Sequence, residues 1–201
     1  MDASRRRLDV STLPMYAFGH QGLIWWGTVG YMVIEGSILL IGLITYYYLR
    51  LRVDQWPPSL PDPDLGYGTA NLLLMFVSCV PAALAKRAAE RYDLRKAQAW
   101  LVVLTLFGVM AMVLRAFEFA ALNCRWDTNA YASIAWFLMA LHATHVLTDV
   151  VEGGVLAALL FTHPPKKKRF VDVSENSLYW YFIVLWWVPY YATIYCAPRW
   201  L

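Results

Sequence analysis

The feature that most constrains this chain is a series of five long, mostly apolar segments. The hydrocarbon core of a bilayer is about 30 Å thick, and a helix needs about 20 mostly apolar residues to cross it. Because lipid offers no hydrogen-bond partner to free backbone groups, such segments are expected to be helical. The sequence therefore predicts an all-α, polytopic membrane bundle, with residues 1–201 as a single transmembrane domain. The expected transmembrane helices cover residues 23–49, 69–85, 99–122, 130–161 and 178–196.

The composition agrees with a membrane environment. The chain is 60% hydrophobic and 15% charged, whereas a soluble domain carries about 25% charged residues. It also contains ten Trp and thirteen Tyr residues. Their rings have an apolar body and a polar tip, which suits the interface between lipid and water.

The Lys and Arg residues alternate between the two predicted sides of the membrane. Twelve of the seventeen lie in the N-terminal segment, the second loop and the fourth loop, four lie on the other side, and Arg115 falls within the third helix. The positive-inside rule then predicts an N-terminus inside and a C-terminus outside. A basic run in the fourth loop is interpreted as a topology signal that touches anionic lipid, not as a nucleic-acid site. The twelve residues are Arg5, Arg6, Arg7, Lys86, Arg87, Arg91, Arg95, Lys96, Lys166, Lys167, Lys168 and Arg169.

The loops predict how the helices connect. Four prolines between residues 57 and 63 indicate an extended first connection. The connection between the third and fourth helices is short, so these two are expected to be antiparallel neighbours. The segment before the fifth helix combines a proline break with a basic run, and Ser174 is a candidate helix cap there.

Ionisable side chains inside spanning helices are costly, so each is a candidate functional residue. Glu35 lies in the middle of the first helix with no cation one helical turn away. It must be protonated, face a wet cavity or pair with another helix. Arg115 and Glu118 are three residues apart and share a helix face. An internal ion pair that fixes helix packing is favoured for these two over a role in transport.

The fourth helix carries a polar stripe made of His142, His145, Asp149 and Glu152. These residues fall within about 80° of the helix circumference, so the stripe must face protein or water, and it could pair with Arg115 or Glu118. Two histidines on one helix suit a metal in spacing. However, the chain has only four histidines, and neighbours on one helix cannot supply both axial ligands of a haem. We therefore predict no metal site and no catalytic residue, since the sequence shows no Ser-His-Asp arrangement, Walker loop or dinucleotide glycine fingerprint.

Several motifs, in order from about Trp25 to Trp200, resemble the subunit III family of haem–copper respiratory oxidases. The first helix is similar to the family's helix with a membrane-embedded glutamate, here Glu35. The other motifs are Arg115-Ala-Phe-Glu118-Phe119, Tyr131-Ala-Ser133, His142-Ala-Thr-His145-Val146, and Leu178-Tyr179-Trp180-Tyr181-Phe182 through Trp187.

The resemblance implies an accessory, non-redox subunit of a proton-pumping cytochrome c or quinol oxidase in aerobic respiration. Such a subunit packs beside subunit I, with subunit II in the same complex, stabilises the assembly, and binds phospholipid near the entrance of a proton pathway. Haem and copper are expected in the partner subunits and none in this chain. The five-helix form with its N-terminus inside fits bacterial members, which implies the inner membrane. The buried polar residues would organise the bundle and its lipid or water contacts.

Departures from the family pattern leave alternatives open. Ile34, Asp149, Tyr181 and Val184 replace residues that the family often has, so the oxidase branch and the electron donor are not set by the sequence. One alternative is a paralogue that serves nitric oxide reductase. Others are a membrane metalloenzyme with its site at His142 and His145, or a small transporter that uses Glu35 or Asp149. Whether Cys124 and Cys196, both expected outside, form a disulfide is also open.

Overall fold

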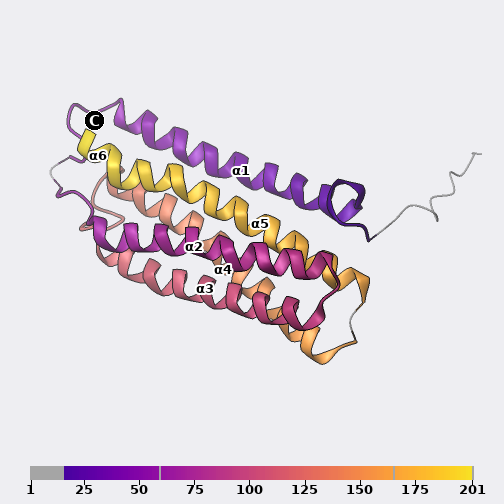
Figure 1. The fold of residues 1–201 in the computed structure, drawn as a ribbon. Coiled ribbons are helices and arrows are strands. Elements are labelled where there is room, and N and C mark those ends of the chain that lie inside the picture. Colours follow the sequence, from indigo (N-terminus) through magenta and orange to yellow (C-terminus); the bar gives the residue numbers. More distant parts are fainter. Residues whose placement is uncertain (1–15, 59, 165, 201) are drawn as a thin grey trace, which may run out of the picture.

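The computed structural model describes residues 16–58, 60–164 and 166–200, and these form a bundle of five long helices (Figure 1). A short 3-10 turn, η1 (Gly19–Gln21), precedes the first helix, and no strand occurs in the described ranges. The predicted all-α class is therefore confirmed. Arg5, Arg6 and Arg7, which enter the charge argument, lie outside the described residues. The helices are α1 (Leu23–Arg50), α2 (Leu65–Glu90), α3 (Leu94–Ala120), α4 (Ala130–Thr162) and α5 (Lys167–Tyr191), followed by a π-helical stretch η2 (Ala192–Cys196) and α6 (Ala197–Trp200).

Four of the five long helices, α1 to α4, are long and apolar enough to cross a membrane. Among the described residues α5 does not reach the same hydropathy. Its first turns carry Lys167, Arg169 and Asp172, and the rest of the helix is rich in Tyr and Trp. Polar ring atoms lower the hydropathy of such a helix without preventing it from packing inside a bundle. The structure thus supports a multi-pass membrane protein with four clearly apolar spans.

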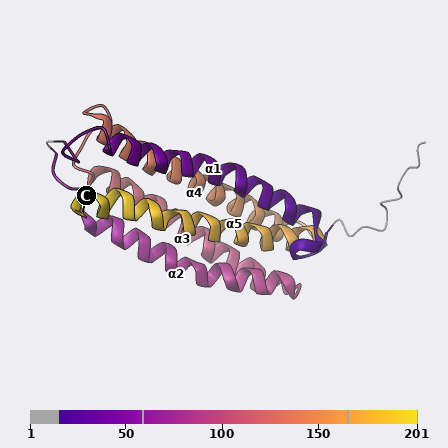
Figure 2. The same ribbon diagram turned by 90° about the horizontal axis from the view of Figure 1, so that it is seen from above.

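Helix α5 occupies the middle of the bundle. It packs against α1, α2 and α4 and has only a small contact with α3, and Figure 2 shows it between α1 and α2. Helix α1 packs against α4 and α5 at the edge, and only 11% of its most apolar window is buried within the bundle. The remaining apolar surface of α1 is available to lipid or to another membrane subunit.

Helix α5 begins at Lys167, eleven residues before the predicted start at residue 178. Ser174 is therefore not a cap but a buried residue inside the helix, and that expectation was wrong. The reason is tertiary packing: Phe170 and Val173 join a small core with Ala85 and Leu160, which stabilises the added turns. The same core explains why α2 extends to Glu90, beyond its predicted end at residue 85.

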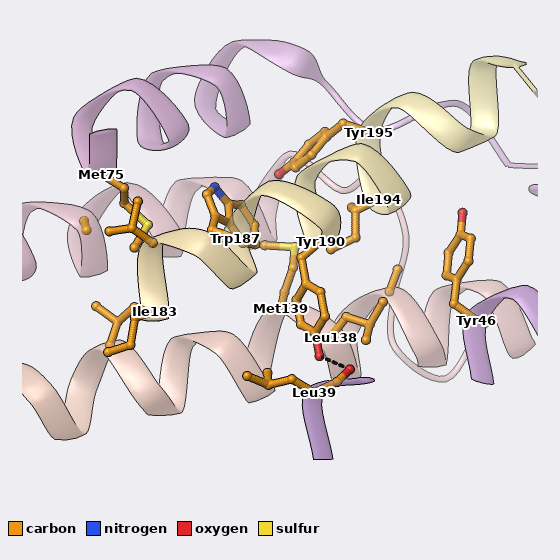
Figure 3. Packing of buried hydrophobic residues seen from close by; sticks show 14 of the residues in the cluster. Leu39, Tyr46, Met75, Leu138, Met139, Ile183, Trp187, Tyr190, Ile194 and Tyr195 are labelled. Carbon is orange, nitrogen blue, oxygen red and sulfur yellow. Dashed lines mark hydrogen bonds between the residues drawn. The ribbon is translucent and has the colours of Figure 1, made fainter. Parts of the chain in front are cut away.

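The main core draws on all five long helices, and Figure 3 shows part of it from close by. Leu39, Leu138 and Trp187 are buried there. Tyr190 points toward α1, and its hydroxyl donates a hydrogen bond of 2.9 Å to the backbone oxygen of Leu39 (Figure 3). Several of the aromatic rings that encircle the last helix in the sequence thus fill the centre of the bundle, where large rings supply most of the buried area.

Candidate functional site: a buried polar layer between the helices

Glu35 links the peripheral helix α1 to the two helices it packs against. The phenol of Tyr179 on α5 donates a hydrogen bond of 2.5 Å to its Oε2 atom. The Nε2 atom of His145 on α4 lies 3.5 Å from its Oε1 atom. The sequence left three possibilities open for Glu35. The structure shows one of them, pairing with other helices.

His145 presents one ring nitrogen to its own helix and the other to Glu35. Its Nδ1 atom is 2.6 Å from the backbone oxygen of Leu141, which can only accept, so Nδ1 carries a proton. Its Nε2 atom is thus the ring nitrogen left to face Glu35.

Arg115 and Glu118 form an ion pair on α3, and both side chains are buried. The guanidinium also lies over the ring of Trp187, with its carbon 3.6 Å from the ring centroid. A buried charge pair is retained only when further contacts offset the cost of removing it from water. The aromatic face on α5 is one such contact, because the ring quadrupole attracts a cation.

His142 provides the next contact to Arg115. The Nη2 atom of Arg115 is 3.2 Å from Nδ1 of His142, and Nε2 of His142 is 3.0 Å from the backbone oxygen of Ile183. A guanidinium can only donate and a backbone oxygen can only accept. His142 is thus assigned as the neutral tautomer with its proton on Nε2. One imidazole fixes α4 to α3 and to α5.

The polar stripe of α4 divides among three neighbours. His142 turns toward α3 and α5, and His145 turns toward α1. The Oδ1 atom of Asp149 accepts a hydrogen bond of 3.0 Å from the amide of Asn176 on α5. Glu152 is exposed and lines a cavity between α1, α4 and α5. The sequence correctly grouped these residues on one helix face, but that face meets several elements.

Sequence reasoning missed four polar residues of this layer: Asp172, Glu175, Asn176 and Tyr179. The first three were assigned to a loop, and Tyr179 was noted only as part of an aromatic motif. A signal was available, because Phe170, Val173 and Ser177 recur at helical spacing and are all buried. That period would have extended the last helix toward Lys167 and placed the acidic residues on a helix face.

The arrangement offers little to a metal ion. Within the described ranges, no group of three or more His, Cys, Asp or Glu side chains is arranged to hold one. Both ring nitrogens of His142 are engaged by protein groups. His142 and His145 therefore point to different partners and do not converge on one ligand position. What the layer does is to connect α1, α3, α4 and α5 through polar contacts in an apolar surrounding.

Comparison with known proteins identifies relatives over most of the chain, although no family model matches. The chain is 26% identical over 196 residues to cytochrome c oxidase subunit 3 of Synechocystis sp., which covers 94% of this chain and 83% of the relative. It is 26% identical over 177 residues to cytochrome c oxidase subunit 3 of Bacillus sp., with 82% of each chain covered. It is 22% identical over 194 residues to the probable cytochrome c oxidase subunit 3 of Nocardia farcinica, which covers 92% of this chain and 93% of the relative.

Proposed function

We propose that this chain, which belongs to the subunit III family of haem–copper oxidases, is an accessory subunit of a respiratory terminal oxidase. The proposal rests on the coverage of the alignments. They leave little of this chain or of its bacterial relatives unaligned. The oxidoreductase activity then belongs to the complex. The names of the relatives favour a cytochrome c oxidase over a nitric oxide reductase.

The proposal includes five membrane crossings, with α5 and η2 as the fifth over about residues 178–196. The N-terminal end of α1 and the C-terminal α6 lie at opposite ends of the bundle (Figure 1), as an odd number of crossings requires. Lys86 lies near the end of α2, and Lys96 and Lys168 lie near the starts of α3 and α5; these helix ends are at the same end of the bundle as the start of α1. With the positive-inside rule, this end is cytoplasmic and the C-terminus is outside, in the inner membrane of a bacterium.

In this proposal the chain stabilises the catalytic subunit and performs no electron transfer itself. Haem and copper belong to subunits I and II. Glu35, Arg115, Glu118, His142, His145 and Asp149 hold the helices in register, and Glu152 faces a cavity near the entrance of a proton pathway. The exposed apolar side chains of α1, such as Ile34, Ile41 and Ile44, provide a surface for phospholipid and for the catalytic subunit.

A pull-down in mild detergent tests this function. The full chain carries a tag at its C-terminus, and the purified material is examined by visible spectroscopy and mass spectrometry. We expect haem absorption bands and a large polytopic catalytic subunit with copper. A tagged subunit III of a characterised oxidase, purified in parallel, shows that the detergent keeps such complexes whole. A colourless chain alone under those conditions, or a nitric oxide reductase catalytic subunit, contradicts the proposal.

A further inference from the structure

A pocket of about 190 Å³ lies where the end of α2 meets the beginning of α3. Helix α2 is on the opposite side of the bundle from α1 (Figure 2), and the pocket shares no residue with the cavity that Glu152 lines. Its floor is apolar and its rim is charged. The floor consists of Leu84, Ala88 and Trp100, and the rim consists of Arg87, Arg91, Asp93 and Lys96.

The single carboxylate of this rim is already engaged by Lys96. The Oδ1 atom of Asp93 accepts a hydrogen bond of 3.2 Å from the backbone N–H of Lys96. Its Oδ2 atom lies 3.0 Å from the Nζ atom of the same residue. Asp93 therefore neutralises Lys96 and caps α3, and the positive charge of the two arginines is left over.

Arg87 and Arg91 are both exposed and lie one helical turn apart at the end of α2. Two like charges four residues apart repel each other and destabilise a helix. Within the described ranges, neither guanidinium forms an ion pair or a side-chain hydrogen bond. An anion bound between the two arginines would replace this repulsion by attraction.

A phosphate group fits these cations better than a carboxylate does. A guanidinium only donates hydrogen bonds, and its planar fork of N–H groups matches the oxygens of a phosphate in pairs. A carboxylate has two oxygens, whereas a terminal phosphate has three and more negative charge, so it can contact both arginines at once. We propose that this pocket binds a phosphate group, supplied by a soluble phosphate compound or by an anionic lipid headgroup.

A role as topology signals alone would not require these residues to share a pocket. The positive-inside rule asks only that Lys and Arg lie on one side of the membrane. Lys167 and Lys168 satisfy the rule at the same end of the bundle without lining this pocket. In the proposed orientation the pocket opens toward the cytoplasm, where both sources of phosphate reach it. That access rests on the proposed function, whereas the phosphate chemistry rests on the pocket alone.

The test has two arms, one for each source. Isothermal titration calorimetry measures binding of inorganic pyrophosphate to the full chain in phosphatidylcholine nanodiscs, whose lipids carry no net charge. Native mass spectrometry of the full chain in detergent counts retained phosphatidylglycerol against phosphatidylcholine. Because lipid can also bind elsewhere on a membrane protein, the second arm is scored as the difference between the parent chain and its variants.

Two pocket variants and one control make the result specific. The double variant Arg87→Gln, Arg91→Gln removes both free cations. Leu84→Trp fills the pocket from α2 without changing the charge, at a position that is only half-buried. The control Lys167→Gln, Lys168→Gln removes the same number of positive charges from exposed positions outside the pocket.

We expect the arginine variant to bind at least about tenfold more weakly than the parent, which corresponds to the loss of one charge-assisted hydrogen bond. Leu84→Trp should lose binding as well, and the lysine control should keep it. This pattern with pyrophosphate supports a soluble source, and the same pattern with phosphatidylglycerol alone supports a lipid source.

Three outcomes overturn the inference. The first is that neither probe binds the parent selectively. The second is that the lysine control loses as much binding as the arginine variant, which would mean that only total charge matters. The third is that Leu84→Trp or the arginine variant binds like the parent, which would place the anion outside the pocket. None of these readouts depends on copurifying haem, so failure here is distinguishable from failure of the proposed function.

Discussion

Tyr179 and Glu35 meet across the interface of α1 and α5, where the phenol donates to the carboxyl oxygen at 2.5 Å. The two residues are 144 positions apart in the sequence. Because α1 lies at the edge of the bundle, this bond and the contact of Glu35 with His145 add to the hydrogen bond from Tyr190 to Leu39 in attaching the helix. They fix the rotation of α1, which decides which of its faces is presented to lipid or to a partner subunit.

Replacing Tyr179 by Phe should weaken the attachment of α1. The change removes one hydroxyl at nearly constant volume and leaves Glu35 without its short hydrogen bond. We expect a loss of about 1–2 kcal/mol in the free energy of unfolding, measured by SDS titration of the purified chain. Tyr67→Phe is the matched control, since the ring of Tyr67 is exposed and stacks on Phe117. Equal stability of the Tyr179 and Tyr67 variants would show that the bond contributes nothing.

The Arg115–Glu118 pair should show a strong non-additive effect. Arg115→Leu leaves a buried carboxylate without its cation and should destabilise the chain by about 3–5 kcal/mol. The double variant Arg115→Leu, Glu118→Leu removes both charges and should recover much of that loss. The same titration on single and double variants gives the coupling energy.

The exposed pair Arg125–Asp127 provides the comparison for that cycle. Its atoms are 3.1 Å apart, but the side chains are 81% and 43% exposed. Removal of this pair should cost about 0–1 kcal/mol. If Arg115→Leu costs no more than Arg125→Leu, the buried pair does not organise the bundle.

The sequence predicted the helices better than their contacts, for a physical reason. Apolar length sets where a chain can cross lipid, so α1 begins at Leu23 and α4 at Ala130 as expected. The period of α4 grouped His142 with His145, but it carries no information on which helix faces each side chain. The sequence placed the start of α5 too late because a charged segment is typical of a loop. The burial of Phe170 against α2 and α4, which stabilises the added turns, is decided only in three dimensions.

The proposed orientation makes a prediction for cysteine labelling in intact cells. Asp54→Cys lies between α1 and α2, and Glu90→Cys lies at the end of α2. In a background where the three native cysteines are replaced by Ser, a membrane-impermeant maleimide should label position 54 from outside and position 90 only after lysis. Lys167→Cys should behave like position 90. Labelling of position 167 from outside would contradict the proposed placement of the α4–α5 connection at the cytoplasmic end.

The cysteines of the chain are free thiols in the structure. Cys124 and Cys196, whose pairing the sequence left open, are therefore not joined by a disulfide. We expect three alkylated cysteines per chain when the denatured protein is treated with iodoacetamide without reductant, measured as intact mass. A chain that takes up only one adduct before reduction and three afterwards would establish a bond instead.

Asp93 should give a small dependence of stability on pH. It caps α3 by accepting from the backbone N–H of Lys96 at 3.2 Å, and its contact with Lys96 holds the pKa of the Asp93 carboxyl below its usual value. A carboxyl with a lowered folded-state pKa stabilises the fold above its unfolded pKa, near 3.9, and that contribution is lost as pH falls through the folded pKa.

The variant Asp93→Asn isolates this effect, because Asn can still cap the helix but carries no charge. We expect the thermal midpoint of the parent chain to exceed that of the variant by about 1–3 °C at pH 7, with the difference vanishing below pH 3. The measurement is differential scanning fluorimetry in detergent across that pH range. In a Lys96→Gln background, Asp93→Asn should change the thermal midpoint less, since the cation that lowers the pKa of Asp93 is gone. A difference between parent and Asn variant that is the same at pH 3 and pH 7 would exclude Asp93 ionisation as its cause.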